Sequence, residues 1–224
     1  MQPLKEYSSS LNISVAGLDL VLHRHSNLEE LWNQMTEEEF TSDERIPYWT
    51  ELWPASLVLS DWLKQNSERI KNTNCLDLGC GLGLTALVAA SCKANVIGMD
   101  YEKEALIYAK KNAIENGLDT VTWTAMDWRY PAVKKQSLDY LWGGDIMYER
   151  RFVQPVLDFL SYSLKPNAKA WLAEPSREEI FALFRHSLDR AGWQYKIVHT
   201  QKIPAIYAQA VPVSVRLWEL GKKL

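Results

Sequence analysis

Hydrophobic and polar positions follow two alternating periods from about residue 75 to the end of the chain. Short apolar runs that are typical of buried strands alternate with segments whose apolar positions recur at helical spacing. Strands are predicted at Cys75–Leu78, Asn95–Met99, Val121–Ala125, Ser137–Trp142, Lys169–Glu174, and about Gln194–Ile203 and Val213–Glu219. Helices are predicted between them at Leu84–Ser91, Glu102–Asn116, Phe152–Leu164 and Glu178–Ala191. This order predicts a doubly wound, mostly parallel seven-stranded sheet of the Rossmann-like α/β class, and the last two strands should form an antiparallel hairpin.

The first part of the chain has a different pattern. Leu11–Leu22 alternates in part and contains Gly17, which predicts a short hairpin. Apolar residues recur at helical spacing in Leu28–Phe40, and Pro54 should open a helix that ends at about Asn66.

Length and composition indicate a single globular core. The chain has 224 residues, of which 47% are hydrophobic and 24% are charged. We expect residues 1–45 to form an N-terminal extension with the hairpin and the first helix, and residues 46–224 to form the α/β domain. The apolar runs are shorter than a membrane span and the N-terminus lacks an apolar signal core, so we expect no membrane association and a cytoplasmic location.

The net charge and the spacing of the cysteines argue against two further kinds of site, one for long nucleic acid and one for a metal ion. The net charge is −3 and no long basic run is present, which argues against binding of long nucleic acid. Cys75, Cys80 and Cys92 lack the spacing of metal ligands, so we expect reduced, buried thiols and no metal site.

The most informative segment for function is the run from Leu76 to Gly83, with the sequence Leu-Asp-Leu-Gly-Cys-Gly-Leu-Gly. It predicts a buried strand, a glycine turn and a helix start, and the next strand is followed by Asp100. Glycines let a ligand lie against bare backbone, and an acid at this strand end accepts hydrogen bonds from the hydroxyls of a ribose. We expect the Asp100 carboxylate at a strand tip, outside the core.

Two kinds of nucleoside cofactor use this geometry. A dinucleotide site requires Gly-x-Gly-x-x-Gly, but position 84 is Leu84 and the third glycine is Gly83. Asp77, just before Gly79, would repel a pyrophosphate but could pair with a cationic amino group. S-adenosyl-L-methionine has such an amino group and no phosphate, so the pattern favours this cofactor over NAD.

With these residues, the chain resembles a class I, seven-stranded S-adenosylmethionine-dependent methyltransferase. More narrowly, it resembles the methyltransferase-like branch that contains protein-lysine methyltransferases. Four motifs carry this resemblance between about positions 47 and 148: Pro47-Tyr48-Trp49-Thr50-Glu51-Leu52-Trp53-Pro54, the glycine loop, Asp127-Trp128 and Asp145-Ile146-Met147-Tyr148.

The resemblance implies a set of cofactor-binding residues. Trp53 would line the pocket, Gly79 and Gly81 would contact the methionine part, and Gly144 would lie near the sulfonium. Asp127 and Trp128 would lie at the adenine, where the indole could cover one face of the purine. The Asp127 carboxylate or a neighbouring amide could bind the adenine amino group. Simple core packing is the alternative for both tryptophans.

The reacting centre is predicted at Asp145 and Tyr148, after the fourth strand of the alternating part. A carboxylate can hold an acceptor amine by hydrogen bonding, and a tyrosine ring can shape the slot and stabilise a developing cation. The alternative for Asp145 is a cap of the following helix. Glu51 is a secondary candidate at the same end of the sheet, with a solvated loop residue as the alternative. Ile146 and Met147 replace the prolines that glutamine and DNA-base methyltransferases carry.

The sequence therefore predicts a methyltransferase that uses S-adenosyl-L-methionine, releases S-adenosyl-L-homocysteine and methylates a protein side chain, with a lysine amine as the favoured acceptor. A small-molecule amine or N-heterocycle is the first alternative acceptor. A non-catalytic cofactor-binding module is the second alternative, and a nucleic-acid methyltransferase is the third.

Overall fold

The structure is a computed structural model of the chain, and it describes residues 8–27, 30–31, 33, 47–175, 177–207 and 211–222. The helix expected at Leu28–Phe40 lies largely outside these residues. Within them, no helix has the length and apolar character needed to cross a membrane.

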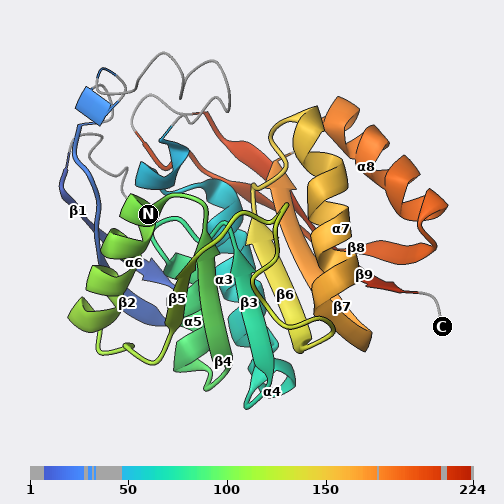
Figure 1. Cartoon of the computed structure of the whole chain (residues 1–224). Helices are drawn as coiled ribbons and strands as arrows, with labels where there is room; N and C mark the ends of the chain where they lie inside the picture. Colours follow the sequence, from blue (N-terminus) through green and yellow to red (C-terminus); the bar gives the residue numbers. More distant parts are fainter. Residues whose placement is uncertain are drawn as a thin grey trace.

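Strands and helices alternate through the described chain (Figure 1). The strands are β1 Ser10–Val15, β2 Leu18–His23, β3 Asn74–Leu78, β4 Asn95–Asp100, β5 Thr122–Ala125, β6 Leu138–Gly144, β7 Leu164–Pro175, β8 Trp193–Ile203 and β9 Val213–Lys222. The α-helices are α3 Pro54–Gln65, α4 Ser67–Ile70, α5 Leu84–Ser91, α6 Lys103–Glu115, α7 Val153–Ser163 and α8 Glu178–Arg190. Short 3₁₀ helices lie at η1 Tyr48–Thr50 and η2 Arg150–Phe152.

The main sheet has seven strands in the order β5-β4-β3-β6-β7-β9-β8. All neighbours in it are parallel except β9, which lies between β7 and β8 and is antiparallel to both. The predicted doubly wound sheet and its antiparallel terminal hairpin are therefore confirmed. Because the strand order reverses at β3, the carboxyl ends of β3, β4 and β6 meet at one switch point, where such sheets bind ligands.

The longest of the described strands, β7, differs most from its prediction. The expected start was Lys169, but β7 begins at Leu164. Its register against β6 shifts between Leu138 and Tyr140, and Asn167 has a φ of 67°. The loop-like residues before Lys169 are thus an irregularity within one strand, which its local sequence does not reveal.

Two hydrophobic layers cover the sheet. α7 and α8 pack on one face with residues such as Leu76, Phe159 and Phe184, while α3 and α5 pack on the other (Figure 1). Cys75 and Leu76 are neighbours in β3 but belong to opposite layers, as the two-residue period of a strand requires. The three cysteines are buried and unbridged, as expected.

The predicted N-terminal hairpin is present as β1 and β2, and its strands pair antiparallel. Its apolar side chains belong to the same cluster as α3 and α5. Two asparagines bind the backbone of β2. Asn116, the residue after α6, accepts from the amide of Val21 at 3.0 Å, and buried Asn112 of α6 accepts from the amide of His23 at 2.6 Å. The edge strand is thereby covered, and the hairpin is joined to the helix that follows Asp100.

Candidate active site

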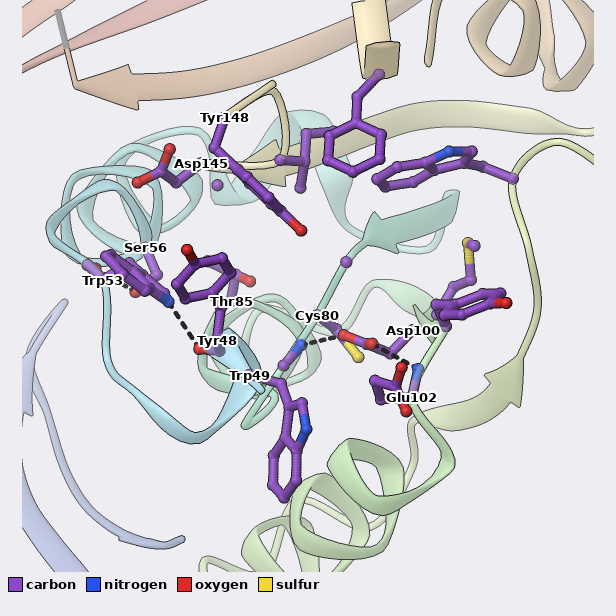
Figure 2. A pocket seen from close by; sticks show the side chains of 18 of the residues that line it. Tyr48, Trp49, Trp53, Ser56, Cys80, Thr85, Asp100, Glu102, Asp145 and Tyr148 are labelled. Carbon is purple, nitrogen blue, oxygen red and sulfur yellow. Dashed lines mark hydrogen bonds between the residues drawn. The ribbon is translucent and has the colours of Figure 1, made fainter. Parts of the chain in front are cut away.

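A cavity of about 630 Å³ opens where β3, β4, β5 and β6 end. Figure 2 shows Asp145, Tyr148 and Trp53 toward one end of this pocket, and Asp100 with Glu102 toward the other. The cavity wall includes most of the predicted site residues, namely Trp53, Gly79, Gly81, Asp100, Asp127, Trp128, Gly144, Asp145 and Tyr148. Asp77 and Gly83 are outside the lining.

Asp100 ends β4 and holds the glycine loop. Its Oδ2 accepts a hydrogen bond from the amide of Gly81 at 2.8 Å, and its Oδ1 accepts from the amide of Glu102 at 3.0 Å (Figure 2). The side chain is only 8% exposed, and burial raises the pKa of Asp100 against the opposing effect of these amides. The expectation of a carboxylate outside the core was therefore wrong, because the strand tip is folded under its own loop.

The three glycines of the loop all have positive φ, at 67° for Gly79, 50° for Gly81 and 86° for Gly83. A Cβ on Gly83 would lie 2.9 Å from the ring of Trp123, and a Cβ on Gly79 would lie 2.9 Å from Ile146. The turn thus requires glycine through its backbone conformation and through packing from neighbouring elements. Gly83 begins α5 rather than facing the cavity.

Asp77 lies in β3 and is 1% exposed. Its carboxylate accepts a hydrogen bond from the hydroxyl of Thr85 at 2.5 Å, and Thr85 lines the cavity. Burial raises the pKa of Asp77 to about 7, although the Thr85 hydroxyl opposes the shift. The predicted pairing of Asp77 with a cationic amino group would therefore have to pass through Thr85 or a water.

Aromatic side chains form a connected wall in the order Trp53, Tyr48, Tyr148, Phe152, Trp128. Successive ring centroids lie 5.7, 5.2, 5.0 and 5.5 Å apart, and every contact is edge to face. The indole of Trp53 also donates to the carbonyl of Tyr48 at 2.9 Å. Neither Tyr48 nor Phe152 was a predicted site residue, although Tyr48 belongs to the motif that contains Trp53.

Asp127 and Trp128 follow β5, as predicted. The Asp127 carboxylate accepts a hydrogen bond from the backbone amide of Arg129 at 2.8 Å. It also forms an ion pair with the guanidinium of Arg129 at 2.8 Å. Trp128 is half-buried and packs against the layer of α7 and α8. The carboxylate that was expected to take the adenine amino group is thus already bound within its own turn.

Asp145 follows β6 with a φ of 56°, and its amide donates to the carbonyl of Ala173 at 2.8 Å. Both carboxylate oxygens are bound by the guanidinium of Arg177, which also lines the cavity. The alternative of a helix cap is wrong, since η2 and α7 begin after Glu149 and Phe152 and neither has a side-chain cap. Arg177 was not predicted, because it is 32 residues from Asp145 in sequence.

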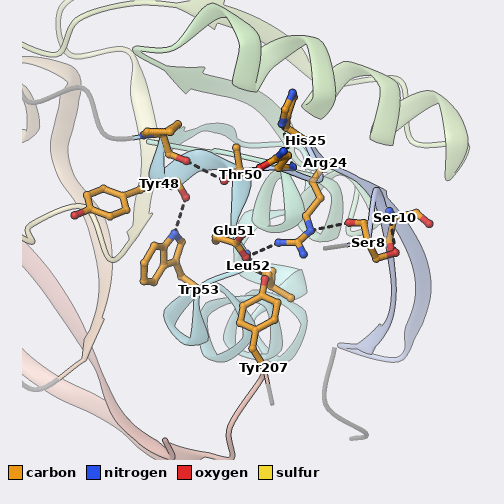
Figure 3. Close-up of polar contacts among 12 residues, drawn as sticks. Ser8, Ser10, Arg24, His25, Tyr48, Thr50, Glu51, Leu52, Trp53 and Tyr207 are labelled. Atoms are coloured by element: carbon orange, nitrogen blue, oxygen red, sulfur yellow. Dashed lines mark hydrogen bonds and ion pairs between the residues drawn. The ribbon is translucent and has the colours of Figure 1, made fainter. Parts of the chain in front are cut away.

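Glu51 lines the cavity, but its carboxylate binds Arg24 at 2.5 Å (Figure 3). The Arg24 side chain is fully buried and lies over the ring of Tyr207 at 5.5 Å. The Tyr207 hydroxyl in turn accepts from the amide of Leu52 at 3.0 Å. Glu51 is therefore not a solvated loop residue: it ties the hairpin to the segment that carries Trp53.

The cavity fits a nucleoside cofactor by size and by its acceptor groups. Its volume is within the range of small-molecule sites. A carboxylate has about four acceptor positions, and the two amides on Asp100 leave capacity for the two hydroxyls of a ribose. Among the described residues, no group of three or more His, Cys, Asp or Glu side chains could hold a metal ion.

Methyltransferases are among the solved structures with the same fold. The 16S rRNA N2 G1207 methyltransferase of T. Thermophilus, in complex with AdoMet and guanosine, matches with a TM-score of 0.64 and 16% identity over 96% of this chain and 50% of that one. A putative RNA methyltransferase from Pyrococcus horikoshii matches with a TM-score of 0.61 and 17% identity over 88% and 98%. The fold is therefore that of class I S-adenosylmethionine-dependent methyltransferases.

Sequence comparison narrows the class. A family model described as lysine methyltransferase matches residues 35–191, and the chain belongs to that family. The protein N-lysine methyltransferase METTL21A of Xenopus tropicalis is 30% identical over 117 residues, which are 50% of this chain and 54% of that protein. The electron transfer flavoprotein beta subunit lysine methyltransferase of Xenopus laevis is 27% identical over 152 residues, which are 67% and 60%. The chain thus spans little more than half the length of these relatives.

Replacing Asp100 with asparagine is expected to weaken S-adenosylhomocysteine binding by about 1.5–3 kcal/mol, the range for hydrogen bonds to a charged group. The asparagine side chain also has an NH₂ group in place of one carboxylate oxygen, and this group cannot accept a hydrogen bond from a backbone amide. One of the two hydrogen bonds that hold the glycine loop is therefore lost. Calorimetric titration measures the affinity. Asp119→Asn, an exposed change in the loop after α6, is the control and should bind as wild type does. Equal affinities for the two variants would remove Asp100 from the cofactor site.

Proposed function

We propose that this protein transfers a methyl group from S-adenosyl-L-methionine to the side-chain amine of a lysine in a protein substrate. The observation that carries the proposal is one continuous cavity, which extends from the Asp100 carboxylate to Asp145 and Tyr148. Membership of the lysine methyltransferase family and the lysine methyltransferase activity named for two relatives support lysine as the acceptor. Reduced cysteines are consistent with the expected cytoplasmic location, which stays a prediction.

Different residues of the cavity would bind different parts of the cofactor. We assign the ribose hydroxyls to Asp100, the adenine to Trp128 and the amide-rich turn at Asp127, and the methionine part to the backbone of Gly79 and Gly81. Gly144 lies where a Cβ would approach the backbone of Ser56 at 3.4 Å, so the wall on that side is backbone. Thr85 would relay the charge of buried Asp77 to the amino group.

When bound, the cofactor supplies a methyl group on a positively charged sulfur. The acceptor nitrogen must approach with its lone pair free, because that pair forms the new N–C bond while the C–S pair returns to sulfur. Asp145 would accept a hydrogen bond from the amine, and the Tyr148 ring would form one side of its slot. Burial raises the pKa of Tyr148, so its hydroxyl stays neutral near pH 7. Placement of this kind supplies much of the rate in a bimolecular transfer.

The test uses cofactor labelled in the methyl group and a lysate as the source of acceptors. We expect label in protein, with methyllysine after hydrolysis. We expect Asp145→Ala to retain S-adenosylhomocysteine affinity and to lose about 100-fold in rate, as a misplaced acceptor does. Tyr148→Phe should be mild if the ring shapes the slot. Label in small molecules only would replace lysine with a small amine as the acceptor, and label in RNA would favour a nucleic-acid substrate. If the protein binds the cofactor but labels neither protein, small molecules nor RNA, then it is a non-catalytic binding module.

A further inference from the structure

At the acceptor end of the cavity, the Asp145 carboxylate already forms an ion pair with a cationic side chain. Asp145 is 8% exposed, and the two terminal nitrogens of Arg177 bind its two oxygens, with the longer contact at 3.2 Å. Arg177 is the N-cap residue of α8, two positions after the end of β7, and its side chain is 34% exposed. Both residues line the cavity, so an acceptor amine would meet the pair and not a lone carboxylate.

The other charged groups around this pair have partners of their own. Those on neighbouring elements are Tyr48, Glu51, Asp100, Tyr148, Glu149, Arg151, Glu174 and Glu178. Glu51 binds Arg24, Glu149 binds Arg151, and Glu174 and Glu178 share Arg216. Tyr48 packs against the ring of Tyr148, and burial raises the pKa of Tyr148, so the Tyr148 hydroxyl stays neutral near pH 7. Asp100 accepts hydrogen bonds from two backbone amides in its own loop. Arg177 is therefore the cation that these contacts assign to Asp145.

A lone carboxylate in this position would hinder methyl transfer to an amine. Lysine is an ammonium ion near neutral pH, and an opposite charge within about 4–6 Å favours the charged form. The ammonium would form a salt bridge with Asp145, bind well and have no lone pair for the methyl group. A neighbouring guanidinium offsets this preference, because a like charge disfavours the ammonium form and so favours loss of its proton to water.

We propose that Arg177 is a positioning residue that keeps Asp145 from binding the acceptor as an ammonium ion, so that the carboxylate receives a hydrogen bond from the neutral amine. The inference rests on the proposed function and deepens it. A carboxylate has about four acceptor positions, and the two that Arg177 uses leave capacity for an amine N–H. The pairing also fixes the position of the Asp145 carboxylate, so that the acceptor meets a fixed oxygen.

The test compares wild type with Arg177→Met and Arg177→Lys, and Arg150→Met is the matched control. Arg150 is outside the cavity lining, and its 3.4 Å contact with Glu179 joins two exposed side chains. For Arg177→Met we expect the pH midpoint of kcat to rise by about one unit, since each unit is tenfold in proton affinity. KM for the acceptor should fall at neutral pH while kcat falls. Arg177→Lys keeps the charge and should stay close to wild type.

A binding measurement gives a readout that does not depend on turnover. n-Butylamine, the head of a lysine side chain, is titrated into each protein saturated with S-adenosylhomocysteine, and tryptophan fluorescence is followed at pH 7. We expect Arg177→Met to bind it about tenfold more tightly than wild type, because the butylammonium ion gains the unpaired Asp145. Circular dichroism checks that each variant is folded.

Two results would overturn the inference. The first is a loss of rate or melting temperature in Arg177→Met with an unchanged pH midpoint and unchanged butylamine affinity, which would make the pair structural. The second is faster transfer at neutral pH, which would make Arg177 a barrier to the acceptor. Failure of the proposed function is seen separately, since the wild-type arm would then transfer no methyl group to lysine.

Discussion

Replacing Glu51 with alanine is expected to lower the free energy of unfolding by about 3–5 kcal/mol, the range for removing one partner of a buried ion pair. The large effect follows from the asymmetry of the pair. The Arg24 side chain is 0% exposed, whereas that of Glu51 is 23% exposed. Removal of Glu51 takes away the carboxylate that binds this buried guanidinium, while the neutral carbonyl of Ser8, which accepts from Arg24 Nε at 3.0 Å, cannot replace its charge.

Urea unfolding at neutral pH measures this loss. Glu68→Ala is the matched control, because Glu68 also pairs with a cation, at 3.6 Å to Lys71, but is 83% exposed. Such surface pairs contribute about 0–1 kcal/mol. Equal, small effects of the two alanine variants would show that the Arg24 pair does not tie the hairpin to the pocket wall. If Glu51→Ala strongly destabilises the protein, the variant should also bind the cofactor more weakly, because Trp53 is two residues away.

The sequence predicted those parts of the fold whose cause is local. The glycine run with positive φ, the alternation of strands and helices, and the start of α3 at Pro54 each follow from residue types in one segment. The Asp-x-x-Tyr motif also lies at the predicted end of the sheet, because parallel strands bring their carboxyl ends together.

The sequence did not reveal which partner binds each polar or charged side chain. Asp145 pairs with a residue 32 positions away, Glu51 with one 27 positions away, and Asn112 with one 89 positions away. These pairings depend on how β7, the hairpin and α6 pack, and no periodicity encodes them. The left-handed conformation of Asp145 likewise results from its place between β6 and Ala173. Most of the predicted site residues therefore line one cavity, but the sequence did not predict the contacts that their side chains make.

The second large effect concerns Asp77 and depends on pH. Burial raises the pKa of its carboxyl from 3.8 to about 7 in the folded protein, whereas the unfolded chain keeps the ordinary value. Below about pH 4 both states are protonated, so the group has no effect. Between about pH 4 and pH 7 the unfolded chain releases its proton first, and the free energy of unfolding falls by about 1.4 kcal/mol per pH unit. This group therefore costs up to about 4 kcal/mol at pH 8.

Asp77→Asn should remove this pH dependence, because the amide stays neutral in both states while its oxygen can still accept from Thr85. Urea unfolding of both proteins at about pH 4.5, 6 and 8 gives the difference at each pH, and any pH-independent cost of the amide cancels in the comparison. Asp139→Asn supplies a control of opposite sign. Burial raises the pKa of Asp139, but Lys165 at 2.7 Å and the amide of Asn74 together outweigh burial and lower this pKa below its ordinary value. That variant should lose stability at pH 8 and approach wild type in acid. If Asp77→Asn follows the wild-type curve at every pH, then Asp77 is ionised in the folded protein, and its charge must be balanced within the cavity even when no cofactor is bound.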